Sequence, residues 1–171
     1  GVRRQRQMCI RDSLKEGDQA IDATAGNGYD TLFLAEQVGP SGKVIAIDIQ
    51  DCAIRSTREK LDSAGLIDRV RLVSEDHSTG LRKLITNNVG KIAALTFNLG
   101  YLPGSDKSIQ TRPESTEEAL TASIQLLTIG GYLCVIAYRG HSEGSAEAES
   151  VEAFMRKSQK EGHCLLYTSD A

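Results

Sequence analysis

The chain has 171 residues, a formal net charge of −3, and four cysteines with no Cys-x-x-Cys pair. This length suits one domain whose core needs no disulfide or metal, and the cysteine spacing excludes the usual zinc sites. The slight negative charge excludes a broad electrostatic attraction to nucleic acids, so an RNA partner would need a local patch. No apolar run approaches the roughly 18 residues of a membrane span. We therefore expect a cytoplasmic protein with no membrane partner.

The two ends of the sequence differ from the rest. Residues 1–13 and 164–171 resemble translated sequencing adapters, strings that recur at the ends of metagenomic gene fragments. We therefore predict that the domain spans residues 14–163 and that neither end belongs to it. The alternative for the basic start is an RNA-binding arm, because residues 1–13 hold four arginines.

From Gln19 onward, strand and helix signals alternate at the spacing of βαβ units. The predicted strands are 19–23, 43–47, 70–74, 92–97 and 132–138. The predicted helices are 29–38, one capped by Asp51 and ending at 64, 81–87, 114–128 and 146–160. Residues 92–97 are almost wholly apolar, as in a central parallel strand buried on both faces. The pattern predicts an α/β fold, a doubly wound and mostly parallel sheet.

The loop after the first strand contains Gly26 and Gly28 in a Gly-x-Gly spacing. Glycines at such a turn allow positive φ and let a ligand approach the backbone closely. Thr31 stands where the dinucleotide fingerprint needs a third glycine, which argues against a pyrophosphate ligand. S-adenosylmethionine has no phosphate and needs polar groups for its ammonium and carboxylate. Four polar residues can supply them: Asp22, Asn27, Asp30 and Thr31. A glycine-rich turn without a ligand is the alternative.

Polar residues also follow the second and third strands, where ligands of doubly wound sheets bind. Asp48 lies about 20 residues after Gly28, at the place of an acid that accepts hydrogen bonds from ribose hydroxyls. It can also be an ordinary acidic residue at a helix entry. Glu75 or Asp76 can accept a hydrogen bond from an adenine amine. His77 is either at the edge of the ligand or on the surface.

The fourth strand leads into Asn98-Leu99-Gly100-Tyr101, which resembles the Asn-Pro-Pro-Tyr element of methyltransferases that act on nitrogen. An Asn oxygen and a following backbone carbonyl can hold the N–H groups of an amine and aim its lone pair at a sulfonium methyl. Such alignment can lower a barrier by about 7–11 kcal/mol. The Tyr101 ring can stack on the substrate or belong to the core.

Three segments together resemble the bacterial YtqB/MnmM family. They are Asp22-Ala23-Thr24-x-Gly26-Asn27-Gly28-x-Asp30-Thr31, Asp48-Ile49-Gln50 and Asn98-Leu99-Gly100-Tyr101-Leu102-Pro103-Gly104-x-Asp106-Lys107-Ser108. The resemblance covers about residues 14–160 and implies a Rossmann-like class I methyltransferase with S-adenosylmethionine as cofactor. It also implies methylation of the primary amine of 5-aminomethyluridine, or its 2-thio form, at the tRNA wobble position. The implied partner is the tRNA anticodon loop.

The resemblance also implies roles for single residues. Those expected to hold the cofactor are Asn27, Asp48, Gln50, Asp76 and His77. Those expected to face the substrate are Asn98, Gly100, Tyr101, Asp106 and Lys107. An alkylammonium must lose its proton before it can attack, so Asp106 or His141 is a candidate general base, with simple loss to water as the alternative.

Basic residues near the expected pocket can contact phosphates of the anticodon loop. The candidates are Lys107, Arg112 and Arg139, and ordinary solvated side chains are the alternative. The sequence departs from the family at three places. Ala25 replaces a frequent Cys, Ser105 replaces a usual Gly, and Tyr138-Arg139-Gly140-His141 replaces Tyr-His-Gly-His, which leaves His141 as the imidazole of that loop.

Class I methyltransferase folds end with an antiparallel hairpin, and the family-like sequence here stops near Gly162. We therefore expect a sheet truncated at this hairpin, with an exposed or mispaired edge that would also permit a homodimer. Two other functions stay open. One is methylation of a small-molecule or protein amine, which the acidic charge suits. The other is a nicotinamide-dependent oxidoreductase or a nucleotide-binding module without catalysis.

Overall fold

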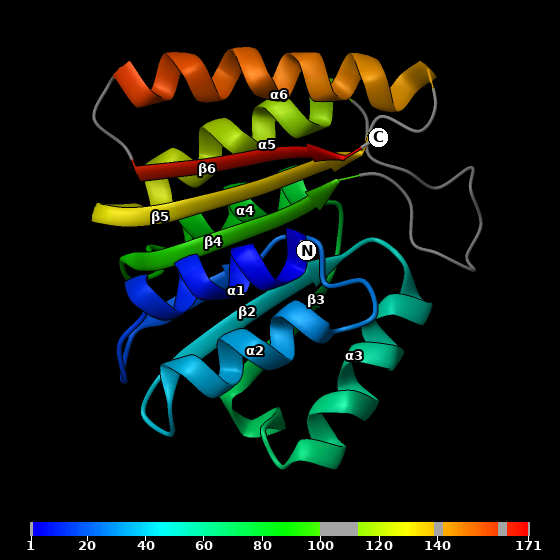
Figure 1. Ribbon diagram of the computed structural model, residues 1–171. Helices are drawn as coiled ribbons and strands as arrows, with labels where there is room; N and C mark the ends of the chain where they lie inside the picture. Colours follow the sequence, from blue (N-terminus) through cyan, green and yellow to red (C-terminus); the bar gives the residue numbers. More distant parts are fainter. Residues whose placement is uncertain (1, 100–112, 139–141, 161–163, 171) are drawn as a thin grey trace.

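A computed structural model describes the backbone of residues 2–99, 113–138, 142–160 and 164–170, and the side chains of 4–99, 114–137 and 146–159. In chain order, the elements are α1 (Val2–Ser13), β1 (Gln19–Asp22), α2 (Tyr29–Val38), β2 (Lys43–Asp48), α3 (Asp51–Ala64), the 3-10 helix η1 (Ile67–Arg69), β3 (Val70–Ser74), α4 (His77–Thr86), β4 (Ile92–Leu99), α5 (Pro113–Leu126), β5 (Leu127–Tyr138), α6 (Ser142–Lys160) and β6 (Cys164–Asp170) (Figure 1).

The strands form one sheet in the order β3-β2-β1-β4-β5-β6, and all described pairings are parallel. Helices cover both faces. One buried cluster joins α1, α2 and α3 to the sheet, and a second joins α4, α5 and α6 to the other face. This confirms the predicted doubly wound α/β fold. All strands point the same way, so their carboxyl ends meet at one edge, on the right of Figure 1.

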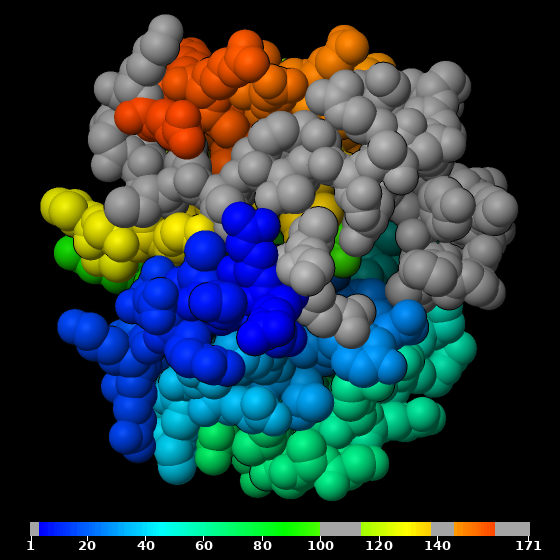
Figure 2. All heavy atoms as spheres, viewed as in Figure 1, coloured from blue at the N-terminus to red at the C-terminus, as the bar shows by residue number. Residues whose placement is uncertain are grey.

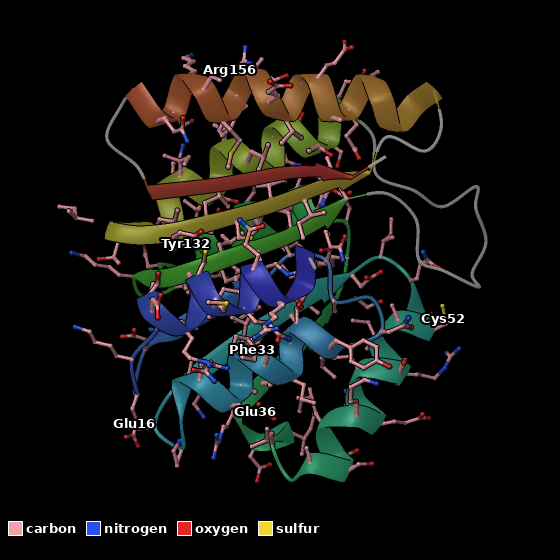
Figure 3. All side chains as sticks on the ribbon, viewed as in Figure 1. Glu16, Phe33, Glu36, Cys52, Tyr132 and Arg156 are labelled. Atoms are coloured by element: carbon pink, nitrogen blue, oxygen red, sulfur yellow. The ribbon has the colours of Figure 1, made fainter. Side chains whose placement is uncertain are left out.

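From Ala94 onward, side chains alternate between the two faces along β4, as the two-residue period of a strand requires. Leu95, Phe97 and Leu99 belong to the cluster under α4 and α5, whereas Ala94 belongs to the cluster under α1 and α2. The apolar run predicted to be a central strand is therefore buried on both faces. Figure 3 shows Phe33 of α2 on the side of the sheet that α1 and α2 cover.

Several helix starts differ from the sequence prediction. Helix α6 begins at Ser142, four residues early, and α5 begins at Pro113, one residue early. Helix α4 begins at His77, four residues earlier than predicted, because the Asp76 carboxylate accepts hydrogen bonds from the backbone N–H groups of Ser78 and Thr79. Asp51 was predicted to cap α3, but the N-cap residue is Gln50, one position earlier. The Asp51 carboxylate instead accepts a hydrogen bond from the Ser74 hydroxyl at 2.8 Å.

The start of β5 also differs from the prediction. Helix α5 ends at Leu126, two residues earlier than expected, and β5 follows at once. The pairing with β4 then shifts, because Ile92 pairs with Leu127 while Ala94 pairs with Tyr132. Gly130 has φ +79°, a left-handed conformation that permits this irregularity. The two glycines predicted to stop the helix instead lie within the irregular start of the strand.

Both ends of the chain form elements of this fold. Helix α1 packs against α2, β4 and β5, and its dark blue side chains lie against those of α2 in Figure 2. Strand β6 pairs in parallel with β5 and forms the sheet edge beyond it. Among the described residues, no antiparallel strand completes a hairpin there. That the natural domain spans residues 14–163 stays a prediction.

Two isoleucines test the assignment of the core. Ile92 is 0% exposed at the start of β4, and Ile129 is 99% exposed at the irregular start of β5. Ile92→Ala should lower the free energy of unfolding by about 2–5 kcal/mol, because it removes buried methyl groups and leaves a cavity. Ile129→Ala should change it by less than about 0.5 kcal/mol. Urea denaturation of both variants measures the difference, and equal effects would contradict this core.

Candidate functional site

The loop that joins β1 to α2 is fixed to the carboxyl ends of the two neighbouring strands. The Ala23 N–H donates to the Thr96 carbonyl of β4 at 2.9 Å, and the Ala25 N–H donates to the Ile47 carbonyl of β2 at 2.9 Å. The Gly26 N–H donates to Asp48 Oδ2 at 2.9 Å. The loop is therefore held on both sides at the edge where ligands of such sheets bind.

The glycine spacing of this loop has a steric cause. Gly26 has φ +57° and Gly28 has φ +87°, so both are left-handed. A Cβ on Gly28 would lie 2.9 Å from the Cα of Thr57 on α3. The Thr57 hydroxyl donates to the Gly26 carbonyl at 3.2 Å. Helix α3 thus packs directly against the loop through Thr57. No pattern in the sequence predicted this contact.

Asp48 joins the loop to the end of β2. Its Oδ2 accepts from Gly26, and its Oδ1 accepts from the Gln50 N–H at 3.0 Å. Burial raises the pKa of Asp48, and the hydrogen bonds from Gln50 and Gly26 oppose this shift. A third backbone hydrogen bond, from Ile49, also acts on this carboxylate, which leaves one of its four lone pairs for a hydroxyl donor. Asp48, Gln50 and Gly26 therefore lie together, and Asn27 is exposed on the loop beside them. That they hold the cofactor stays a prediction.

Asp76 caps α4 and ties it to α5. It accepts from the N–H groups of Ser78 and Thr79, from the Ser78 hydroxyl, and from the Ser115 hydroxyl at 2.9 Å. Burial would raise the pKa of Asp76, but the hydrogen bonds from Ser78 and Ser115 hold it below its ordinary value. Four donors already occupy this carboxylate, so its role in the fold is shown while contact with an adenine stays a prediction.

His77 is buried at the first turn of α4 and is 5% exposed, so it is not a surface histidine. Its ring meets the Phe97 ring edge-on, with centroids 5.7 Å apart and planes at 70°. Within the described part of the chain, Nε2 has no hydrogen-bond partner. Burial lowers the pKa of His77, and the nearby Asp76 only partly offsets this. A neutral imidazole with one unsatisfied nitrogen therefore lies beneath the predicted cofactor edge.

A buried charged cluster lies at the base of the loop. Asp22 Oδ2 accepts from the Thr31 hydroxyl at 2.7 Å, and Oδ1 accepts from the Thr24 N–H at 3.2 Å. Asp30 pairs with the Arg6 guanidinium of α1 at 2.7 Å. Burial and then the negative charge of Asp30 raise the pKa of Asp22 to about 7. Three of the four residues predicted to meet the ammonium and carboxylate thus lie together.

Arg6 was missed because the start of the chain was set apart as an adapter. The spacing of Arg6, Ile10 and Leu14 places one residue on every helical turn of the same face, and all three are buried. This periodicity was the signal available in the sequence. The arginine lies on the inner face of α1 and not on an exposed arm.

Asn98 lies half-buried near the end of β4, and its N–H donates to the Thr24 hydroxyl at 2.6 Å. This bond fixes the predicted amine-binding residue to the cofactor loop. The remaining predicted catalytic and substrate residues lie outside the described residues: Gly100, Tyr101, Asp106, Lys107, Arg112, Arg139 and His141.

Within the ranges that the structure describes, no group of three or more His, Cys, Asp or Glu side chains is placed to hold a metal ion. No helix in those same ranges has the length and apolar character that a membrane crossing needs.

The sheet order and the ligand edge define a Rossmann-like class I methyltransferase fold. A family model described as "Putative rRNA methylase" matches residues 44–169, and the chain belongs to that family. A crystal structure of a putative rRNA-methylase from Clostridium thermocellum superposes with a TM-score of 0.83 and 44% identity, covering 89% of this chain and 80% of that one.

Two further relatives carry more specific descriptions. A putative methyltransferase from Streptococcus mutans, in complex with SAH, superposes with a TM-score of 0.77 and 34% identity, covering 90% of this chain and 80% of that one. A chloroplastic tRNA (mnm(5)s(2)U34)-methyltransferase of Arabidopsis thaliana is 42% identical over 149 residues, which are 82% of this chain and 54% of that protein. The chain spans about half the length of the curated relatives it matches.

Gly28→Ala should destabilise the protein more than Gly65→Ala. Both glycines have positive φ, at +87° and +72°, which costs an alanine about 1–2 kcal/mol. A Cβ at Gly65 meets nothing within 4 Å, whereas one at Gly28 meets the backbone of α3. The clash should add at least about 1 kcal/mol to the loss. Equal losses in urea denaturation would contradict the packing of α3 on the loop.

The buried Asp22 should make stability depend on pH. Its pKa is raised from 3.8 to about 7, so the folded protein holds a proton that the unfolded chain releases between these values. Stability should therefore fall as pH rises through this window, by at most about 1.4 kcal/mol for each pH unit. Asp22→Asn should lack this component. Denaturation of both proteins from pH 5 to pH 8 measures it, and parallel curves would contradict an uncharged Asp22 at low pH.

Proposed function

We propose that this chain is an S-adenosylmethionine-dependent methyltransferase that methylates the amine of 5-aminomethyluridine, or its 2-thio form, at the tRNA wobble position. The observation that carries the proposal is the loop of Gly26 and Gly28, held between β2 and β4 with its N–H on Asp48. The name of the Arabidopsis thaliana relative supports the choice of tRNA. The SAH in the Streptococcus mutans structure supports the choice of cofactor.

The residues of this edge fit such a cofactor. Asp48 keeps a lone pair for a ribose hydroxyl, and the left-handed Gly26 beside it adds no side chain to the loop. The neutral His77 offers one free nitrogen where the adenine is expected. The amino acid group of the cofactor, its methionine end, would meet oxygens of Asp22, Asp30 and Thr31. Asn27 and Gln50 would also contact the cofactor. When bound, the cofactor supplies a methyl group on a positively charged sulfur.

The chain's own task in the reaction is alignment. Asn98 would hold the substrate amine through its side-chain oxygen. The Gly100 backbone and the Tyr101 ring would position the uracil. With the cofactor bound, the lone pair of the neutral amine would take the methyl group, and the sulfur would keep the electron pair of the broken C–S bond. The amine's proton goes to Asp106, His141 or water. Because alignment alone can lower the barrier by about 7–11 kcal/mol, no further chemical group is required.

The proposed partner is the anticodon loop of tRNA in the cytoplasm. Lys107, Arg112 and Arg139 would contact its phosphates, so binding should weaken as salt concentration rises. The net charge of −3 offers no general attraction for RNA, so these local contacts would carry the binding.

The test is transfer of a labelled methyl group from S-adenosylmethionine to tRNA that carries 5-aminomethyluridine, followed by nucleoside digestion. Label in 5-methylaminomethyluridine is the expected result. If the label appears in a small-molecule or protein amine and none appears in tRNA, the proposed substrate is wrong but the proposed reaction, N-methylation, stands. Binding of NAD in place of S-adenosylhomocysteine would overturn the class.

Asn98→Ala should lower the rate of methyl transfer by about 100-fold or more, because it removes a group that aligns the amine. S-adenosylhomocysteine should bind as before, since Asn98 is assigned to the substrate. Asn87→Ala, an exposed asparagine at the end of α4, is the matched control and should leave both unchanged. Single-turnover rates and calorimetry separate the two effects. An unchanged rate in Asn98→Ala would remove this residue from the mechanism.

A further inference from the structure

A row of polar side chains crosses the face of the sheet that α1 covers. Thr96 on β4 pairs in register with Asp22 on β1 and with Cys134 on β5, so the three side chains lie on one face. Ala94, two residues before Thr96, packs in the same cluster as Ile10 of α1. The row therefore lies beneath α1, at the carboxyl ends of the central strands.

Arg6 of α1 lies over this row. Its guanidinium pairs with Asp30, and its charge acts on both Asp22 and Cys134. Arg6 is 3% exposed and Thr96 is 2% exposed. The structure thus places a cation, two carboxylates and a hydroxyl together, next to the loop that contains Gly26 and Gly28.

Two polar atoms of this cluster have no hydrogen-bond partner among the residues that the structure describes. They are Arg6 Nε and Thr96 Oγ1, both buried. Leaving a buried donor unsatisfied costs roughly 1–3 kcal/mol, and such groups in native structures usually meet a ligand, water or ion. The ion pair with Asp30 does not satisfy Arg6 Nε, because it uses a different nitrogen of the guanidinium group, Nη2.

The unsatisfied atoms indicate what would fit. Nε–H of Arg6 and O–H of Thr96 are both donors, so they suit an anion such as a carboxylate. Asp22 lies beside them and suits a cation. An α-amino acid group carries both charges, and the methionine end of the proposed cofactor is such a group.

We propose that Arg6 and Thr96 bind the α-carboxylate of the cofactor's amino acid end, with Arg6 held in place by Asp30. The proposal rests on the proposed function, because it names a further part of the same site. It also gives α1 a role in binding, although the sequence alone set residues 1–13 apart from the domain.

The test compares two ligands that differ in the amino acid group. S-adenosylhomocysteine carries the α-carboxylate, and 5′-methylthioadenosine lacks the amino acid end altogether. Arg6→Gln should weaken binding of S-adenosylhomocysteine by about tenfold or more, as loss of a hydrogen bond to a charged group predicts. Binding of 5′-methylthioadenosine should not change. Thr96→Val, which keeps the shape and removes the hydroxyl, should weaken only S-adenosylhomocysteine as well.

Arg4→Gln is the matched control, because Arg4 is exposed on the same helix and the change in charge is the same. It should leave both affinities unchanged in calorimetry. Unchanged 5′-methylthioadenosine binding also shows that each variant is folded.

Three results would overturn the proposal. If Arg6→Gln weakens both ligands equally, Arg6 supports the fold and not the carboxylate. If it tightens S-adenosylhomocysteine, Arg6 competes with the ammonium for Asp30. If the unaltered protein binds 5′-methylthioadenosine as tightly as S-adenosylhomocysteine, the carboxylate has no site, while the cofactor assignment stands. Failure to bind either ligand would remove the proposed function too.

Discussion

The hydrogen bond from the Gly26 N–H to the Asp48 carboxylate is the contact on which the site depends. It links the loop after β1 to the end of β2, and it does so only because Gly26 and Gly28 adopt left-handed conformations. Helix α3 then packs against the same loop through Thr57. One short turn thus fixes the relative positions of two strands and a helix at the ligand edge.

Burial and hydrogen bonding set the protonation of two carboxyl groups at this edge, Asp22 and Asp76. Asp22 is buried among apolar strands and beside Asp30, so its pKa rises to about 7. Asp76 is also partly buried, yet four donors keep its pKa low. Two acids at the same edge of the sheet therefore differ in protonation near neutral pH because of their burial, hydrogen bonds and neighbours. The protonation of Asp22 can therefore change when a charged ligand binds nearby, whereas Asp76 stays ionised and caps α4.

The sequence predicted the parts of the fold that depend on local pattern. Residues 92–97 are apolar enough to indicate a central strand, and the spacing of Gly26 and Gly28 indicated the loop. The start of α4 was missed because it depends on the Asp76 side chain, which could equally have been a ligand contact. Arg6 was missed because residues 1–13 were set apart from the domain, although its spacing with Ile10 and Leu14 indicates one buried helix face. That spacing does not indicate the partner of Arg6, because Asp30 lies 24 residues away in the chain.

The segment 100–112 begins and ends next to anchored residues. Before it, the Asn98 N–H is bonded to Thr24 of the cofactor loop, and after it, Ser115 is bonded to Asp76 at the start of α4. The separation of its two ends is therefore set by the folded core. Bringing Leu99 and Pro113 to this separation is therefore a cost of folding. The loss of either anchor, Thr24 or Ser115, would release one of these two ends from the core.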